Sequence, residues 1–263
     1  LYNSLLTAVS LKGDNYTYQN PLNAEKHNRW EWHGCPCCPP MFLKITSALP
    51  GFIYASDKKG VYINLFIGSE TEIKLSSKNS VQLKQETSYP WKGKVNISVN
   101  PQKTDKFPIK VRIPGWAQGI ENPYELYQSN LKGAPQLLSL IHISEPTRLR
   151  RINRKWQKGD LIELELPIQP RIITAHTNTK DLSNTVCIAS GPIIYCFEDV
   201  DNPDFKDFRL DTNAPLEIIY QKDLLNGVNI IKSNGKTTAI AIPYYSITNR
   251  KRDSSHKVWV PKL

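Results

Sequence analysis

Three closely spaced cysteines give this sequence its strongest chemical signal. Cys35, Cys37 and Cys38 occur within RWEWHGCPCCPP, residues 29–40. The two prolines that follow suit the first turn of a helix, so the adjacent cysteines are expected immediately before a helix N-terminus. Unpaired N–H groups and the positive end of the helix dipole stabilise a thiolate there. Because thiolate binds zinc and attacks electrophiles, the trio predicts a metal site, a nucleophile or both.

The cysteines form a poor disulfide framework. The chain holds five, an odd number, and a bond between the adjacent Cys37 and Cys38 would close a strained ring. Cys187 and Cys196 stand alone in apolar stretches, where cysteine is usually a small buried hydrophobe. Clustered thiols in a domain of this size therefore favour metal ligands or catalytic groups.

A complete zinc site is not expected from these residues alone. Zinc takes four ligands in a tetrahedron, and Cys37 and Cys38 are not easily joined by both Cys35 and His33 without strain. No CxxC pair and no HxxxH spacing occurs elsewhere in the sequence. The trio therefore predicts a half-site that other residues complete.

Aromatic residues precede the cysteines. Trp30, Trp32 and His33 are suited to lining a ligand pocket, and core packing explains the two tryptophans about equally well. Glu31 is the carboxylate closest in sequence to the cysteines. Its place between the tryptophans favours packing or ligand contact over acid catalysis.

Helices are expected on both sides of this loop. Residues 2–11 place Leu5, Leu6 and Val9 on one helical face. A second helix is expected from the two prolines to Pro50-Gly51, with Phe42, Ile45 and Leu49 on its buried side.

After residue 51 the pattern changes to short strands with a period of two, which predicts an antiparallel β-sandwich. These strands are FIYAS, VYINLFI, TEIKL, VQLKQET, KVNISVN, PIKVRIP, LIELELPI, RIITA, TVCIAS and PIIYCFE. Weaker strands follow after residue 207 at EIIY, VNII, TAIAI and KVWV. They predict a smaller β-unit or an extension of the same sandwich.

Residues 138–148, LSLIHISEPTR, interrupt this rhythm with no matching turn chemistry. The peptide is what a common transposon-type sequencing adapter encodes in one frame. We therefore expect the genuine gene to lack it, and assign no role to His142 or Glu145. The alternative is an ordinary surface loop.

Composition excludes disorder and disfavours two classes of partner. The 263 residues are 40% hydrophobic and carry a net charge of +10. The basic residues are scattered, which favours a solvated surface over a nucleic-acid interface. No apolar run approaches the roughly 20 residues of a membrane span. The sequence begins at Leu1 with neither an initiator Met nor a signal-peptide pattern, so we expect it to be the later part of a longer protein. Whether that protein is cytoplasmic or periplasmic stays open.

The sequence resembles glycoside hydrolase family 127, the β-L-arabinofuranosidases and their relatives. HGCPCCPP with the following helix, then LPGFIYAS and VYINLFIGSE, is similar to the active-site loop and sandwich entry of that family. The resemblance continues at LYNSLLTAVSLKGDNYTYQNPL, IKVRIPGWA, SGPIIYCFEDVDN and IPYYSITNR. CPCCPP and RIPGWA together are specific, and nearly the whole chain is covered. Met41 stands where the family commonly has asparagine.

The resemblance implies a mainly β fold, in which the end of an (α/α)6 barrel precedes antiparallel β-sandwich domains. Residues 1–51 would be the barrel end with the cysteine loop, 52–206 a β-sandwich, and 207–263 a C-terminal β extension or small second β domain. It implies a retaining glycosidase with Cys37 as nucleophile and zinc ligand and Cys38 as zinc ligand. His33 and Trp32 would contact the carbohydrate. The acid/base glutamate and remaining ligands have no matching motif here.

Two other functions remain open at this point. A non-catalytic carbohydrate-binding sandwich would use Trp91, Trp116 and Tyr244-Tyr245, and leaves the trio unexplained. A structural zinc module lacks ligands. For each interpretation we expect no nucleic-acid and no membrane partner, and homodimer formation is left open.

Overall fold

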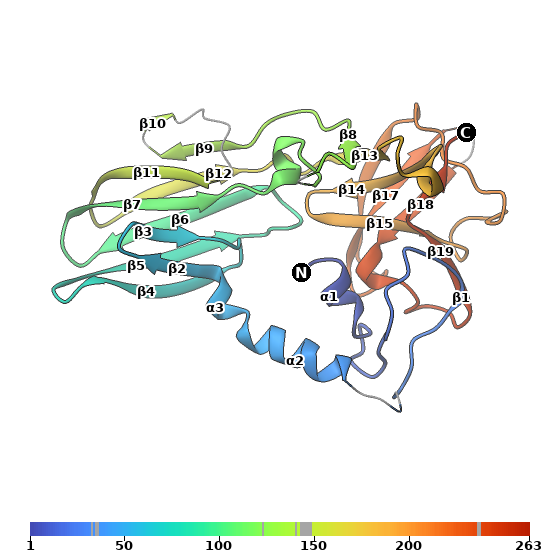
Figure 1. Ribbon diagram of the computed structural model, residues 1–263, viewed down its shortest axis with the longest axis horizontal. Coiled ribbons are helices and arrows are strands. Elements are labelled where there is room, and N and C mark those ends of the chain that lie inside the picture. The colour runs from blue at the N-terminus through green and yellow to red at the C-terminus, as the bar shows by residue number, and fades with distance from the viewer. Residues whose placement is uncertain (33, 35–36, 123, 140, 143–148, 236–237) are drawn as a thin grey trace. The chain divides into compact units, whose positions relative to one another are not determined.

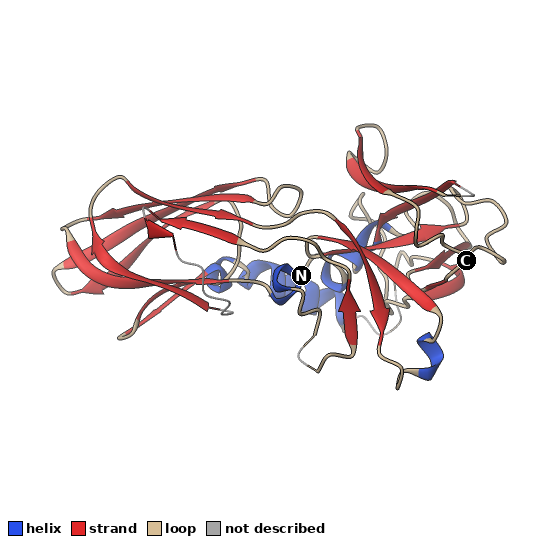
Figure 2. Cartoon of the chain, turned by 90° about the horizontal axis from the view of Figure 1, so that it is seen from above, coloured by secondary structure: helices blue, strands red, loops and turns tan. Residues whose placement is uncertain are grey.

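Strands dominate the computed structural model, and the helices are short (Figures 1 and 2). The structure describes residues 1–32, 34, 37–122, 124–139, 141–142, 149–235 and 238–263. The mainly β class predicted from the sequence is confirmed. No helix in this described part has the length and apolar character needed to cross a bilayer.

The chain divides into two compact units. Unit 1 comprises Leu1–Lys44, Gly119–Leu131 and Gln169–Leu263, and unit 2 comprises Ile45–Gln118 and Lys132–Ile168. The described helices are α1 (Ser4–Thr7), α2 (Cys38–Ala48) and α3 (Pro50–Ile53), with 3-10 turns η1 (Gly115–Gln118), η2 (Lys180–Leu182) and η3 (Tyr244–Ser246). The (α/α)6 barrel to which the first helices were assigned stays a prediction.

Unit 2 is a sandwich of two sheets. One has six strands in the order β10-β9-β12-β6-β5-β4, and the other has four in the order β11-β7-β3-β2. All pairs are antiparallel except β3 with β7, a departure from the expected purely antiparallel sandwich. The bounds are β2 (Tyr54–Asp57), β3 (Gly60–Ile63), β4 (Ser69–Ser76), β5 (Asn79–Thr87), β6 (Lys94–Pro101), β7 (Asp105–Arg112), β9 (Gln136–Ser139), β10 (Ile141–His142), β11 (Leu149–Trp156) and β12 (Asp160–Glu165).

The core of unit 2 follows from the alternation in its strands. On β5 and β6 every second side chain is buried, as strand geometry requires when one face packs against a partner sheet. Val81 and Ile97 from the six-stranded sheet join Ile109 and Trp156 from the other in one cluster. The Trp156 indole N–H also donates to the Phe107 carbonyl at 2.9 Å, so its polar edge is satisfied inside the core.

Unit 1 is built on one ten-stranded sheet, and the strand pairs that the structure describes in it are all antiparallel. Its main path runs β16-β17-β18-β15-β14-β13-β8, and β1, β19 and β20 join it at the sides. The central strands β14 and β15 are buried over almost their full length. The bounds are β1 (Asn23–His27), β8 (Tyr127–Ser129), β13 (Pro170–Ala175), β14 (Thr185–Ser190), β15 (Ile193–Glu198), β16 (Leu216–Gln221), β17 (Val228–Asn234), β18 (Thr238–Pro243), β19 (Ser254–Lys257) and β20 (Val260–Pro261).

The N-terminal helices differ from the sequence prediction. Instead of continuing to residue 11, α1 ends at Thr7, because Val9 forms a β-bridge with Tyr16. The Asn3 amide explains where α1 docks, since it donates to the Pro192 carbonyl and accepts from the Ile194 N–H of β15.

The expected buried side of the second helix was wrong. Ile45 is 39% exposed, and Phe42 and Leu49 are only partly buried. Pro50 also begins the separate turn α3 instead of ending a helix, because proline fits the first position of a new helical turn.

Residues 138–148 fall partly outside the described residues. Their described part contributes Leu138 and Ser139 to β9, which pairs with β12, and residues 141–142 to the short strand β10. Residues 140 and 143–148, including Glu145, lie outside the described residues. The expectation that the gene lacks this segment stays a prediction.

Candidate functional site

The cysteine loop begins at a fixed point on unit 1. Trp30 and Tyr16 form an antiparallel bridge in which each N–H donates to the other's carbonyl, at 2.8 and 2.7 Å. At its other end the loop enters α2, whose first residue is Cys38. The cysteines therefore lie at a helix N-terminus as the prolines predicted, with Cys38 inside the first turn and Cys37 immediately before it.

The Cys37 side chain is exposed. Its Sγ lies 3.6 Å from the Tyr18 hydroxyl, an O–H···S contact in which either atom can be the donor. The start of an 11-residue helix favours negative charge on the sulfur, and a hydroxyl donor stabilises it further. This combination suits a thiolate.

Two cavities adjoin the loop. The larger, about 800 Å³, is lined by Trp30, Glu31 and Trp32 together with residues from segments 10–15 and 248–252. The smaller, about 500 Å³, is lined by Tyr18, His27, Trp30 and Gly34, among others. Trp30 lines both, so it forms a shared wall. Tyr18 connects the smaller cavity to the Cys37 sulfur.

Of the two predicted sugar-contact residues, the structure describes Trp32 but not His33. Trp32 is 64% exposed and lines the larger cavity, so it is not a core residue. Trp30 is 57% exposed. His33 and Cys35 lie outside the described residues, as does the side chain of Cys38. Their expected roles stay predictions.

The described residues supply part of the donor chemistry that zinc needs. Among the described residues, no three His, Cys, Asp or Glu side chains gather closely enough to hold a metal ion. An exposed thiol next to a second cysteine does fit zinc, for which thiolate is a preferred ligand. The residues present are therefore compatible with part of a zinc site.

Arg29 was missed by the sequence analysis, although it opens the cysteine motif. Its guanidinium donates to three main-chain carbonyls, those of Thr7 at 2.7 Å, Ile247 at 3.0 Å and Tyr245 at 3.4 Å. Burial lowers its pKa to about 10, and the negative charge of Glu198 opposes that shift. Arg29 thus ties the beginning of the loop to the turn that follows β18.

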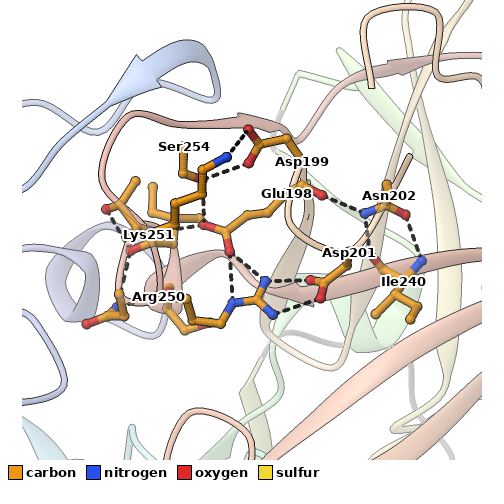
Figure 3. A network of polar contacts seen from close by, with 12 residues as sticks. Glu198, Asp199, Asp201, Asn202, Ile240, Arg250, Lys251 and Ser254 are labelled. Carbon is orange, nitrogen blue, oxygen red and sulfur yellow. Dashed lines mark hydrogen bonds and ion pairs between the residues drawn. The ribbon is translucent and has the colours of Figure 1, made fainter. Parts of the chain in front are cut away.

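Glu198 is a second residue that the sequence analysis did not single out. It is 1% exposed at the end of β15, and it accepts from the Thr248 N–H at 2.7 Å and from Arg250 Nη2 at 2.7 Å. Figure 3 shows the Arg250 guanidinium between the carboxylates of Glu198 and Asp201. Burial alone would lower the pKa of Arg250, but these hydrogen bonds and charges raise it.

This network fixes the wall of the larger cavity. Thr248 has a φ of 55°, an uncommon conformation for a β-branched residue, and its N–H is held by the buried carboxylate of Glu198. Asn202 closes the other side by donating to the carbonyls of Glu198 and Ile240 (Figure 3). A signal was present in the sequence, because a carboxylate ends the otherwise apolar strand PIIYCFE.

Two histidines on the paired strands β1 and β19 pack against each other beside the smaller cavity. His27 lines the cavity, and its ring packs edge-on against His256, with centroids 5.5 Å apart. Burial, then the charges of His256 and Arg29, lower the pKa of His27 to about 4. Burial also lowers the pKa of His256, whose Nε2 lies 2.8 Å from the Pro21 carbonyl.

Cys187 and Cys196, the strand cysteines, are buried as expected for small hydrophobes. Burial raises the pKa of Cys187 to about 12 and that of Cys196 well above its usual value. Neither has the exposure or the ionisation that a nucleophile needs.

Three domain models of one family match successive parts of the chain. The β-L-arabinofuranosidase, family 127 catalytic domain matches residues 1–51, the family's middle domain matches 60–168, and its C-terminal domain matches 170–261. Together they cover nearly every residue. The chain belongs to glycoside hydrolase family 127.

Known proteins of family 127 resemble the chain over its whole length. It is 27% identical to a non-reducing end β-L-arabinofuranosidase from Bifidobacterium longum, over 95% of the chain and 43% of that protein. A solved family 127 β-arabinofuranosidase superposes on all of it with a TM-score of 0.90 and 31% identity, over 44% of that structure. The structure of a β-L-arabinofuranosidase from Geobacillus stearothermophilus superposes with a TM-score of 0.86 and 28% sequence identity, over 100% of this chain and 45% of that one. The chain thus spans less than half the length of these relatives.

The burial of the aromatic residues argues against the alternative of a non-catalytic carbohydrate-binding sandwich. Two of its four proposed contact residues are unsuited to a sugar surface. Tyr244 is 1% exposed and donates its hydroxyl to the Pro21 carbonyl, while Trp116 packs against the core of unit 2. Trp30 and Trp32, which are both exposed, lie instead in the segment that matches the catalytic domain.

Proposed function

We propose that this chain is the thiolate-bearing portion of a retaining glycoside hydrolase that cleaves β-L-arabinofuranosides. One observation carries the proposal. Within the segment that matches the family 127 catalytic domain, Cys37 is an exposed thiol at a helix N-terminus, in contact with a tyrosine hydroxyl. The arabinofuranosidase relatives support the choice of substrate.

The reaction needs a nucleophile and a proton donor. Cys37 Sγ attacks the anomeric carbon, so that a C–S bond forms as the bond to the leaving oxygen breaks, and a carboxylic acid protonates that oxygen. Water then attacks the same carbon, the sulfur leaves as thiolate, and the carboxylate takes the water's proton. Two inversions give net retention. The proton donor is assigned to a glutamate outside this sequence.

Residues of this chain prepare the thiolate. Once Cys37 is ionised its sulfur can only accept, so the Tyr18 hydroxyl at 3.6 Å would be the donor, and the N-terminus of α2 adds a favourable field. Cys37 and Cys38 would hold zinc through their thiolates, and zinc would supply positive charge that keeps the sulfur ionised at neutral pH. Arg29 keeps the loop in place by its three carbonyl contacts.

The test compares cysteine variants in the protein encoded by the complete gene. Cys37→Ser should lower hydrolysis of nitrophenyl β-L-arabinofuranoside by several orders of magnitude, because a hydroxyl stays protonated near neutral pH, and zinc is partly retained. Cys38→Ser should release zinc and lower activity with it. Cys187→Ala, at a buried strand cysteine, is the matched control and should stay active with full zinc content.

Two results would contradict the proposal. The first is full activity in Cys37→Ser. The second is turnover of the same substrate by the 263-residue chain alone, because the proton donor and two zinc ligands are assigned outside it.

A further inference from the structure

The outer face of the four-stranded sheet of unit 2 is strongly basic. Its strands are β11, β7, β3 and β2 (Figure 1), and alternate side chains of β7 and β11 point away from the core. Five of these outward side chains are cations: Lys106, Lys110 and Arg112 on β7, and Arg151 and Lys155 on β11. All five belong to unit 2. Strand pairing thus gathers on one face basic residues that are scattered along the sequence.

The register places like charges opposite one another. Arg151 pairs with Lys110 and Lys155 pairs with Lys106, and directly opposite residues share one face of a sheet. Their Cβ atoms lie about 5 Å apart, a spacing at which like charges destabilise a sheet. None of the five cations forms an ion pair with any residue that the structure describes. A bound anion would relieve this repulsion.

The described carboxylates of these strands do not neutralise the face. Asp57, at the end of β2, accepts from the Tyr62 hydroxyl at 3.1 Å. Tyr62 in turn accepts from Lys110 Nζ at 2.6 Å, and the same ammonium lies 4.2 Å from the centroid of its ring. Asp105 has the opposite orientation on β7, since its carboxylate accepts from Asn79 of the six-stranded sheet at 3.3 Å. The outer face therefore has a clear excess of positive charge.

The cations form a row suited to a polymer. From Lys106 to Arg112 the row extends roughly 20 Å along β7, at about 3.4 Å a residue. Arg151 and Lys155 run beside it on the neighbouring strand. A row of this length matches several consecutive charges of an extended chain better than it matches one small anion.

The chemistry of this face fits carboxylates on a polysaccharide better than nucleic acid. The guanidinium groups of Arg112 and Arg151 can each bind a carboxylate through two parallel hydrogen bonds. Proteins that bind single-stranded nucleic acid stack bases on open aromatic rings, whereas Lys110 occupies the ring of Tyr62. A sheet face also presents no helix or two-stranded ribbon that could enter the groove of a duplex.

We infer that the outer face of this sheet binds an acidic polysaccharide, whose carboxylates lie along the cations of β7 and β11. The choice of a polysaccharide rests on the family of the chain, since the face lies in the segment that matches the middle domain of family 127. The surface uses no residue of the cysteine loop, so the inference goes beyond the proposed function and is independent of the cysteine mechanism. Binding there holds the protein on a charged glycan.

The test is a calorimetric titration of the protein encoded by the complete gene with polygalacturonate fragments. Saturable binding is expected at roughly 50 mM salt, and the Kd should rise about tenfold or more at roughly 500 mM, because salt screens surface charges. A double variant, Arg151→Gln with Lys155→Gln, should raise the Kd about tenfold or more at the lower salt concentration. Its melting temperature should not fall, since both side chains are exposed and face like charges.

A matched control removes two positive charges from the other sheet of unit 2. Lys74→Gln with Lys84→Gln changes exposed lysines on β4 and β5, and the Kd should stay within about twofold of the parent value. An equal loss of binding in this control would overturn the inference, because net charge alone would then explain the affinity. An absence of saturable binding, or equally tight binding of neutral dextran, would also overturn it.

Other polyanions decide the class of partner. At equal concentrations of negative charge, polygalacturonate should bind more tightly than duplex DNA, single-stranded DNA or vesicles of anionic lipid. Tighter binding of DNA or vesicles would contradict the inference. The double variant at Arg151 and Lys155 should hydrolyse nitrophenyl β-L-arabinofuranoside at the parent rate, so that loss of glycan binding is separate from loss of catalysis. If the parent binds polygalacturonate but hydrolyses no arabinofuranoside, the proposed function fails and this surface stands.

Discussion

Replacing Glu198 by glutamine keeps the shape of the side chain and removes its charge from a position that is 1% exposed. The carboxylate bonds Thr248 N–H at 2.7 Å and Arg250 at 2.7 and 3.2 Å. Breaking a buried ion pair costs about 3–5 kcal/mol. The glutamine oxygen can still accept from Thr248, and Arg250 keeps Asp201. We therefore expect the free energy of unfolding of unit 1 to fall by about 3 kcal/mol, the lower end of that range.

The assay is a guanidinium titration read by hydrogen–deuterium exchange in peptides from β14 and β15, which report on unit 1 alone. Glu217→Gln is the control, because Glu217 is an exposed carboxylate of the same unit, opposite Lys232 on β17. It should change stability by less than about 0.5 kcal/mol. A Glu198→Gln variant as stable as this control would refute the claim that the buried charge holds the 248–252 wall.

Three further predictions concern titration, reactivity and the gene. His27 and His256 titrate near pH 6.5 when unfolded and lower when folded, so below pH 6.5 the unfolded chain binds more protons. The free energy of unfolding of unit 1 should therefore decrease as the pH is lowered from 6.5 to about 4. In calorimetric melts, the melting temperature of His27→Gln should depend less on pH over this range than that of the parent protein. Iodoacetamide should alkylate Cys37 quickly, and Cys187 and Cys196 only after unfolding, as followed by peptide mapping. Equal alkylation rates for the three cysteines in the folded protein would contradict the burial of the two strand cysteines. Long reads across the source locus should lack codons for 138–148, and in-frame reads would end that hypothesis.

The strands could be predicted because their information is local. In β5 and β6 the alternation of apolar and polar residues follows from one buried face, and the same pattern is visible in the sequence. The helix before them was predicted from its prolines for a similar reason. Its expected buried side was wrong, because periodicity shows which residues share a face but not whether a partner covers it.

The residues that support the site could not be predicted in the same way. Arg29 donates to carbonyl groups more than 200 positions later in the chain. Glu198, at the end of β15, forms an ion pair with Arg250, which lies far from it in the sequence. No spacing rule joins such residues. The thiol trio was visible because adjacent cysteines are chemically unusual, whereas a single arginine or glutamate gains its role only from the folded neighbours that accept or donate to it.

The most direct measurement is covalent labelling of the complete protein with a mechanism-based arabinofuranose probe of the cyclophellitol or haloacetamide type, followed by peptide mass mapping. The proposed function predicts one dominant label on Cys37, and loss of that label together with activity in Cys37→Ser. A label on Glu31 or another carboxylate, with Cys37→Ser still active, would contradict the cysteine mechanism and leave the trio as a purely structural metal site.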